Sequence, residues 1–493
     1  MCAISCIANF KENLTKNLPY YRLLTEQINS TQISLKNCGS WIGEHAALCA
    51  PGSEKLITKI CEGYQFVIAF SGELYDKEPL RHELDIPGYC FTYGCDAELA
   101  LNSYIHFGEK SLSKLSGSFS FVIYDAMRRQ IFAASDRFSS RPLFYSRTKD
   151  SFVLSSGING ILAHPEIDAK VSLAGLCELF SVSRNCSGNI FEDIFMLPPA
   201  HILKIKDSGL QLKCYACDKE EDSSENADAE KIVSKVIADM AGDSSTMLLL
   251  GGSRDEELCR LLCRHHLKSA RQTTVYSFTA PPEGIYRLSA NCRQFSLDES
   301  SVYTGLENAV LACGLPMLSD KDFLLSVMSR HVGNGSTDIF TALPDISEPN
   351  ISYSDILVKN NAFFPAVEET LITGDIPSGT TPNWPLMIAQ STNMNLKTPI
   401  FDARMRGLVK NHAFGSAGIA FVPETARTAL KHILLEIISE NNSPILAFFN
   451  KSALLRLYEG SFDFNDSDLT EGELISYIIK LNIWLEKYRP SII

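Results

Sequence analysis

Two short apolar runs that end at glycine limit the folds open to this chain of 493 residues. The run from Thr246 to Leu250 is almost wholly apolar, as a buried parallel strand would be, and it stops at Gly251-Gly252. A helical pattern of apolar residues follows from Glu256 to His265. A strand, then glycines, then a helix present backbone N–H groups to a phosphate. The pattern therefore indicates a phosphate-binding loop in the second half of the chain.

The other run lies in the first half, from Phe66 to Phe70, and leads into Ser71-Gly72-Glu73. It predicts a strand that ends in a glycine turn, where backbone N–H groups can face a pocket. Asp96 precedes an apolar-periodic stretch that continues to Phe107, so it is expected near a helix N-terminus. Residues 115–125 alternate as a strand does.

Cys2 combines two catalytic functions once Met1 is removed, because the residue then carries a thiol and a free α-amine. An α-amino group has a pKa near ~7.7–8.0, so part of it is neutral at physiological pH and can take the thiol proton. By position alone, an early Cys is more often a small buried hydrophobic residue. The neighbouring segments favour the nucleophile.

Cys2 and six later segments, in this order, resemble the glutaminase domain of the class II glutamine amidotransferases, in the branch fused to asparagine synthetase. The segments are residues 70–76, 95–98, 115–125, 135–145, 162–165 and 196–203. The resemblance covers about residues 1–215 and implies that Cys2 attacks the side-chain amide of glutamine. It also implies that Ser71 and Gly72 form the oxyanion hole and that Glu73 and Asp96 bind glutamine, Asp96 through its α-amine.

Two departures from that family lie in the same site. Ser71 stands where relatives carry Asn, and loss of one oxyanion donor typically costs ~10²–10³ in turnover. The family's carboxylate-binding Arg is absent, because its segment here reads His45-Ala46-Ala47-Leu48. Alanine cannot replace a bidentate, charge-assisted pair. A folded but catalytically silent glutaminase domain is therefore an open alternative.

The second half resembles the synthetase domain of the same family, with a pyrophosphate loop at Leu250, Gly251, Gly252 and Ser253. The resemblance implies ATP and Mg²⁺ as cofactors if the site is active, and none otherwise. Asp255, behind one inserted residue, and Asp338 are the expected Mg²⁺ ligands. Both are expected in one cleft at the carboxyl ends of parallel strands. Leu250 replaces a Ser, Asn334 stands where relatives carry Glu or Tyr, and the Lys-rich catalytic segment is not found.

The resemblance predicts an α/β and α+β protein of two domains. Residues 1–215 are expected to form the α-β-β-α sandwich of the N-terminal-nucleophile hydrolases. Residues 216–227 form an acidic linker. Residues 228–493 are expected to form a parallel α/β domain like that of the pyrophosphate-loop ATPases.

Composition excludes some partners and compartments. A net charge of −13 disfavours nucleic acid and anionic membranes. The apolar runs fall short of the ~18 residues that span a bilayer, and the N-terminus lacks the basic segment of a secretory signal. Fifteen cysteines are an odd and scattered set, which predicts reduced thiols in the cytoplasm.

Three functions fit the sequence. The first is glutamine-dependent, ATP-driven formation of asparagine or a related amide, as in peptide or β-lactam biosynthesis, with glutamine and an unidentified carboxylate acceptor as substrates. The second is a silent homologue that binds a partner, and the third is a hydrolase that uses Cys2 alone. A homodimer and a partner protein both stay open. Since both sites depart from the family, synthesis of free asparagine is expected to be undetectable while the fold persists.

Overall fold

The computed structural model describes most of the chain. The residues outside the description are 1–3, 31–37, 53–54, 86–90, 182–189, 217–228, 241–244, 250–252, 269–272, 279–284, 286, 288–290, 317–319, 331, 333–337, 342–352, 365–383, 393, 395, 400–423, 465–469 and 493. The chain forms two compact units. The first contains residues 1–168, 193–240 and 401–407, and the second contains residues 169–192, 241–400 and 408–493.

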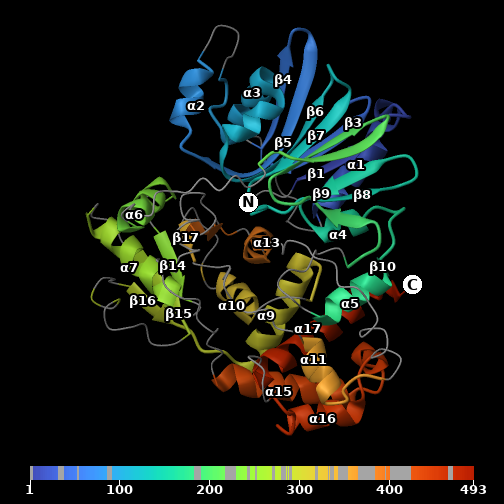
Figure 1. Cartoon of the computed structure of the whole chain (residues 1–493), viewed down its shortest axis with the longest axis vertical. Coiled ribbons are helices and arrows are strands. Elements are labelled where there is room, and N and C mark those ends of the chain that lie inside the picture. The colour runs from blue at the N-terminus through green and yellow to red at the C-terminus, as the bar shows by residue number, and fades with distance from the viewer. Residues whose placement is uncertain are drawn as a thin grey trace. The chain divides into compact units, whose positions relative to one another are not determined.

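Two six-stranded antiparallel sheets form the first unit (Figure 1). One sheet has the order β11-β8-β9-β1-β3-β2 and the other has the order β13-β12-β7-β6-β5-β4. The strands of the first sheet are β1 (Ser5–Ala8), β2 (Cys38–Ile42), β3 (Ala46–Pro51), β8 (Phe144–Arg147), β9 (Phe152–Ser155) and β11 (Ile194–Met196). Those of the second are β4 (Leu56–Cys61), β5 (Tyr64–Tyr75), β6 (Ser116–Asp125), β7 (Gln130–Ser135), β12 (His201–Lys206) and β13 (Gly209–Cys214).

Helices cover the outer face of each sheet. Helices α1 (Leu18–Ser30) and α4 (Ile158–Leu162) pack on the first sheet, and α3 (Asp96–Phe107) packs on β4 and β5 of the second. The remaining elements of this unit are η1 (Leu14–Asn17), α2 (Glu78–Glu83), η2 (Gly108–Ser113) and α6 (Ala229–Met240). The predicted α-β-β-α sandwich is confirmed.

Strand alternation builds two cores, one on each face of the second sheet. Phe66, Ile68 and Phe70 of β5 join a cluster under α3. Val67 and Ala69, which point the other way, join a cluster with residues of the first sheet. Because successive side chains of a strand face opposite sides, one apolar run serves both layers.

The second unit contains a parallel sheet of order β16-β15-β14-β17-β18, as expected for an α/β domain. Its strands are β14 (Ser245–Leu249), β15 (Thr273–Ser277), β16 (Asn291–Gln294), β17 (Asp338–Phe340) and β18 (Leu396–Lys397), with β10 (Lys170–Val171) paired to β19 (Ser491–Ile492) apart from it. The helices are α5 (Leu173–Ser181), α7 (Ser253–Lys268), α9 (Glu299–Cys313), α10 (Asp320–Ser329), α11 (Tyr353–Lys359), α13 (Trp384–Ser391), α15 (Glu424–Ser439), η5 (Pro444–Ala447), α16 (Lys451–Tyr458) and α17 (Glu471–Tyr488).

Two segments belong to the unit on the other side of the predicted linker. Residues 169–192 group with the second unit, and α6 groups with the first. All but the first residue of the predicted linker, 216–227, lie outside the described residues, so its boundaries stay a prediction. No helix in the described part of the chain is long and apolar enough to span a bilayer.

The predicted glycine turn after Phe70 is wrong, because β5 continues to Tyr75 and pairs with β6 along its whole length. Gly72 lies opposite Phe119 with φ +118°, and a Cβ added there would lie 1.9 Å from the Ser118 carbonyl oxygen. The same holds for Gly117 on β6, since a Cβ added there would lie 2.3 Å from the Glu73 carbonyl oxygen. Both positions therefore require glycine.

We expect Gly72→Ala to lower the free energy of unfolding of the first unit by about 3 kcal/mol or more, because φ strain and a backbone overlap add. Gly209→Ala is the matched control. Gly209 has a similar φ of +123°, but no atom lies within 4 Å of an added Cβ. Calorimetric melting gives the loss in the free energy of unfolding for each variant. The difference between the two losses is the cost of the backbone overlap. Equal losses in the two variants would contradict the close approach of β5 and β6.

Candidate active site of the first unit

The face of β5, β6 and β7 that looks toward the first sheet changes from apolar to polar along the strands. Val67, Ala69, Val122 and Ala133 lie in the apolar core between the sheets. One step further on the same face come five polar residues: Ser71 and Glu73 on β5, Ser118 and Ser120 on β6, and Ser135 on β7. Polar side chains inside a sandwich cost free energy unless they are satisfied, so a row of them marks a site.

The three central serines form one cross-strand row. Ser71 pairs with Ser120, and Ser120 pairs with Ser135. All three are fully buried, and the Ser135 hydroxyl donates to the Pro198 carbonyl oxygen at 2.7 Å. The Ser120 hydroxyl has no hydrogen-bond partner among the described residues. The row thus places beside Ser71 a buried hydroxyl with no partner in the described part of the chain.

Asp136 supports this end of β6 from the loop after β7. Its carboxylate is buried and accepts hydrogen bonds from the backbone N–H of Phe119 at 3.0 Å, of Phe138 at 2.8 Å and of Ser140 at 3.1 Å. The Ser140 hydroxyl also donates to Asp136 and lies 2.8 Å from the Ser118 hydroxyl. Burial raises the pKa of Asp136, while these donors lower it. Asp136 is therefore a positioning residue for the strand opposite Gly72.

Lys55 places an ammonium group beside Gly72. Its Nζ donates to the Gly72 carbonyl oxygen at 2.9 Å and lies 5.2 Å from the centre of the Phe70 ring. Ala46 and Ala47 are fully buried and carry no charge. Lys55 is thus a cation beside the strand that carries Ser71 and Gly72.

Asp96 is the first residue of α3, as predicted, and both of its carboxylate oxygens are engaged. Oδ2 accepts from the Leu74 N–H at 2.9 Å, and Oδ1 lies 2.7 Å from Lys77 Nζ. The Asp96 side chain is 11% exposed and that of Lys77 is 36% exposed. An internal ammonium therefore occupies the carboxylate that the resemblance assigns to the α-amine of glutamine.

Glu98 fixes the loop that leads to Asp96. It is fully buried and accepts from the backbone N–H groups of Thr92, Tyr93 and Gly94 at 2.7–2.8 Å. Burial alone would raise the pKa of Glu98, but Lys59 at 2.8 Å and the three N–H groups hold it below its ordinary value. These contacts of Glu98 stabilise the loop that precedes α3.

Cys2 lies outside the described residues, and β1 begins at Ser5. Ser5 pairs with Cys49 near the end of β3, and the chain that follows β3 leads to Lys55, which contacts Gly72. Ile4, Cys6 and Ala8 face the core between the sheets. The start of β1 therefore lies beside the carboxyl end of β3. The chain runs from that end of β3 to Lys55.

The predicted nucleotide loop is described only in part. Leu250, Gly251 and Gly252 lie outside the described residues, and α7 begins at Ser253. Asp255 lies in the first turn of α7 and is 3% exposed. A carboxylate in the first turn also stabilises a helix through its dipole, with or without a metal.

Asp338 does not lie at the carboxyl edge of the sheet, so its predicted position is wrong. Parallel pairing aligns Asp338 with Ser245, the first residue of β14, whereas Asp255 follows the last residue, Leu249. Ser245 and Leu249 mark the amino and carboxyl edges of the sheet, and they lie four residues apart, about 13 Å along the strand. Asp338 instead faces Lys397, with Nζ 3.6 Å from Oδ1, and both are buried. The described residues contain no cluster of three His, Cys, Asp or Glu arranged for a metal ion.

Several site residues escaped the sequence analysis: Lys55, Lys77, Glu98, Asp136, Ser120 and Ser135. One signal was available, because Ser116, Ser118 and Ser120 recur with period two in a strand that is otherwise apolar. Lys55 and Lys77 gave no sequence signal, since their partners, Gly72 and Asp96, are 17 and 19 residues away in the chain.

Comparison with known proteins agrees with this geometry. The glutamine amidotransferase domain family matches residues 59–216. Asparagine synthetase 3 (glutamine-hydrolysing) of Bacillus subtilis is 29% identical over 67% of this chain and 60% of its own length. Asparagine synthetase 1 of Bacillus subtilis is 36% identical over 19% of the chain and 15% of its own length. Amidase chry2 of Gibberella zeae is 29% identical over 27% of the chain and 19% of its own length.

Among solved structures, glutamine phosphoribosylpyrophosphate amidotransferase of Bacillus subtilis matches 78% of this chain and 92% of its own, at 12% identity and TM-score 0.33. A score this low does not establish a common architecture for the whole chain. The sandwich and the domain match indicate that the first unit resembles a glutamine amidotransferase domain. The sequence relatives named here show that the chain is similar to glutamine-hydrolysing asparagine synthetases. The chain covers less than two thirds of the length of the curated relatives named here.

We expect Lys397→Met to destabilise the second unit by about 3 kcal/mol, because it removes the ammonium that faces a buried carboxylate. The double variant Asp338→Asn/Lys397→Met should regain most of that loss. Lys359→Met is the control, since its pair with Asp463 at 3.0 Å is exposed and worth about 1 kcal/mol or less. Thermal melting measures all three. Recovery of the single variant by Mg²⁺ would instead indicate that Asp338 is a metal ligand.

Proposed function

We propose that this protein is a glutamine-dependent amidotransferase in which Cys2 releases ammonia from glutamine for an amide-forming reaction on a carboxylate acceptor. The observation that carries the proposal is the polar end of the sandwich interior, where Ser71 and Ser120 follow the apolar Ala69 and Val122 on one face. The similarity to asparagine synthetases and the match of residues 59–216 to the glutamine amidotransferase domain family support it.

In this proposal the Cys2 α-amine takes the thiol proton, and the sulfur attacks the side-chain amide carbon of glutamine. The Ser71 and Ser120 hydroxyls and the Gly72 N–H stabilise the oxyanion, replacing the amide donor of relatives. Ammonia leaves with the transferred proton, and water then cleaves the thioester to glutamate. Lys55 meets the substrate carboxylate and Asp96 its α-amine.

The proposal for the acceptor reaction rests on fewer residues than the proposal for glutamine. ATP with Mg²⁺ would activate the acceptor carboxylate in the second unit, as in the family, but the predicted carboxylates do not fit one magnesium site. Asp255 follows the carboxyl end of β14, and Asp338 is paired with Lys397 at the amino end of β17. Asparagine, a peptide amide and a β-lactam-type product remain candidate products.

A second candidate, a catalytically silent homologue that binds a partner, is favoured by the pair of Lys77 and Asp96. The ammonium at 2.7 Å satisfies the carboxylate that should bind substrate. A site with its recognition group internally neutralised binds an amino acid more weakly, since the substrate must displace a charge-assisted pair.

We expect purified protein to have lost Met1 and to hydrolyse glutamine, and Cys2→Ala to abolish hydrolysis because it removes the nucleophile. Intact mass and glutamate release measure this, with Cys61→Ala, a change at a partly exposed cysteine, as the control. Assays of asparagine and pyrophosphate with aspartate, ATP and Mg²⁺ test the acceptor separately. Wild-type protein without Met1 that releases no glutamate would establish the silent homologue.

We expect Lys77→Met to speed labelling of Cys2 by a thiol-reactive glutamine analogue about tenfold, because Asp96 becomes free for the α-amine of the analogue. Lys114→Met is the control, as Lys114 pairs with Glu83 at 2.6 Å and its side chain is 34% exposed, close to the 36% of Lys77. Peptide mapping measures the rate at Cys2. Slower labelling would show that Lys77 orients Asp96 for the substrate and does not compete with it.

A further inference from the structure

A cavity of about 500 Å³ lies on the helix-covered face of the second sheet of the first unit, away from the candidate active site. Its wall combines the end of α3 and the start of η2 with β7, β12 and the turn into β13. The lining residues are Tyr104, Gly108, Glu109, Arg128, Gln130, Phe132, Lys204, Lys206, Ser208, Gly209, Leu210 and Gln211.

The cavity is separate from the active-site face by strand geometry. Gln130 and Phe132 project toward the α3 side of β7, whereas Ser135 projects toward the first sheet. Gln130 also lies five residues from Ser135, about 17 Å along the strand. A ligand in the cavity would therefore contact neither Ser71 nor Ser120.

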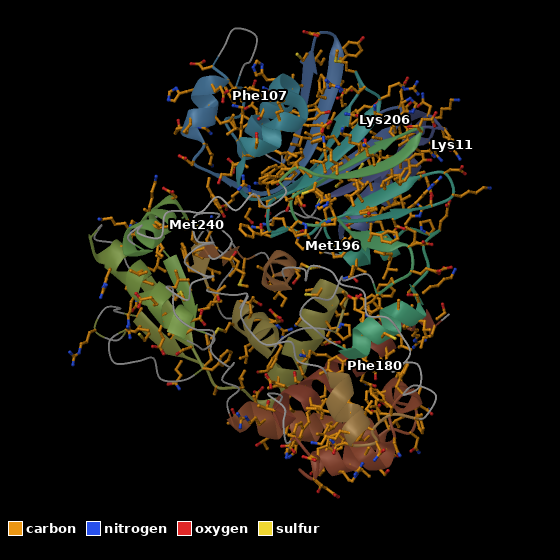
Figure 2. The ribbon with its side chains drawn as sticks, in the orientation of Figure 1. Lys11, Phe107, Phe180, Met196, Lys206 and Met240 are labelled. Atoms are coloured by element: carbon orange, nitrogen blue, oxygen red, sulfur yellow. The ribbon has the colours of Figure 1, made fainter. Side chains whose placement is uncertain are left out.

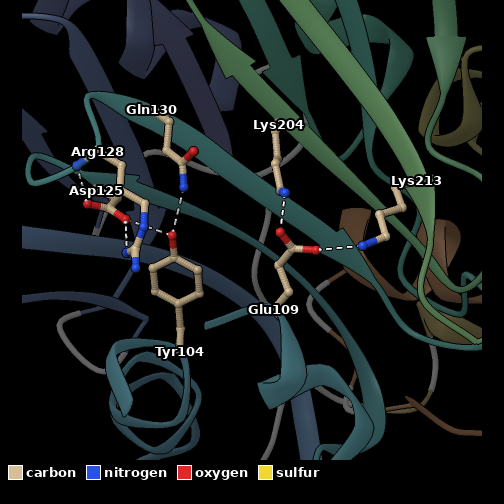
Figure 3. A network of polar contacts seen from close by, with 7 residues as sticks. All are labelled: Tyr104, Glu109, Asp125, Arg128, Gln130, Lys204 and Lys213. Atoms are coloured by element: carbon tan, nitrogen blue, oxygen red, sulfur yellow. Dashed lines mark hydrogen bonds and ion pairs between the residues drawn. The ribbon is translucent and has the colours of Figure 1, made fainter. Parts of the chain in front are cut away.

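The floor of the cavity is a buried polar network (Figure 3). The Tyr104 hydroxyl donates to Asp125 Oδ2 at 2.8 Å and accepts from Gln130 Nε2 at 2.9 Å. Arg128 lies 2.9 Å from the same carboxylate. Burial, and then the charge of Asp125, raises the pKa of Tyr104, so the phenol stays neutral. Phe132 supplies the apolar part of the floor.

The rim of the cavity carries an excess of positive charge. Glu109 is held between Lys204 and Lys213, the latter at 3.0 Å, and the two ammonium groups lower its pKa (Figure 3). Lys206, at the end of β12 (Figure 2), has no ion pair recorded within the described part of the chain. Cations outnumber carboxylates here, although the whole chain has a net charge of −13.

We propose that this cavity binds a small phosphate ester, with the phosphate between Lys206, Lys204 and Arg128 and the organic part along the turn between β12 and β13. The volume lies in the range of small-molecule sites, roughly 300–1,000 Å³. A dianion matches the positive excess, and lysine and arginine are the usual phosphate ligands. The pre-formed hydrogen bonds of Tyr104 and Gln130 keep the floor rigid, which lowers the ordering cost of binding.

Isothermal titration calorimetry of the full chain with ribose 5-phosphate tests the proposal, with ribose and inorganic phosphate as separate arms. We expect ribose 5-phosphate to bind, phosphate to bind more weakly and ribose not to bind. Added salt should weaken binding, because the contacts are partly exposed.

Lys206→Gln should weaken binding of ribose 5-phosphate about tenfold, the loss expected for one charge-assisted contact. Lys11→Gln is the matched control, because Lys11 is an exposed lysine of the same unit, paired with Asp150 at 2.6 Å, and should leave binding unchanged. Both substitutions lie at the surface and should leave the melting temperature unchanged. No binding by the folded wild-type chain, or equal binding by Lys206→Gln, would overturn the proposal.

Discussion

The close approach of β5 and β6 at Gly72 and Gly117 is the constraint on which the first unit depends. Each glycine lies where a Cβ would overlap a carbonyl oxygen of the other strand. The two strands share the longest ladder in the sandwich, and they carry both cores and the polar end of the interior. Without that contact, Ser71 and Ser120 would no longer pair across the two strands. Asp136 would also lose the hydrogen bond that it accepts from the Phe119 N–H.

Charge placement in the candidate site follows from the same strands. Lys55 reaches the Gly72 carbonyl oxygen, and Lys77 reaches Asp96 from the residue before α2. The site therefore keeps its acids but gains two ammonium groups of its own. In the proposed function, the α-amine of the substrate must displace Lys77 from Asp96, so recognition depends on displacement as well as on attraction.

The two-domain architecture could be predicted from the resemblance to a known family, whereas strand alternation and helix periodicity predicted single elements because they are local signals. The strand over 115–125, the helix that begins at Asp96 and the parallel strand before Gly251 all agree with the structure. The error at Gly72 arose because a glycine inside a long strand looks like a strand end. The error at Asp338 arose because motif spacing cannot tell the start of a strand from its end. Thr341, which follows β17, is the residue at the carboxyl edge.

Helix α5 has a consequence for synthesis of the chain on the ribosome. Its apolar side chains pack against elements near the C-terminus: Phe180 contacts Phe363 and Phe449, and the Leu179 carbonyl oxygen accepts from the Tyr477 hydroxyl at 2.6 Å. At about 5–20 residues per second, some 300 residues take roughly 15–60 s to follow. Nascent chains must therefore carry an uncovered apolar helix through most of translation, which makes α5 a natural chaperone client segment and a point where stalled or truncated chains would aggregate.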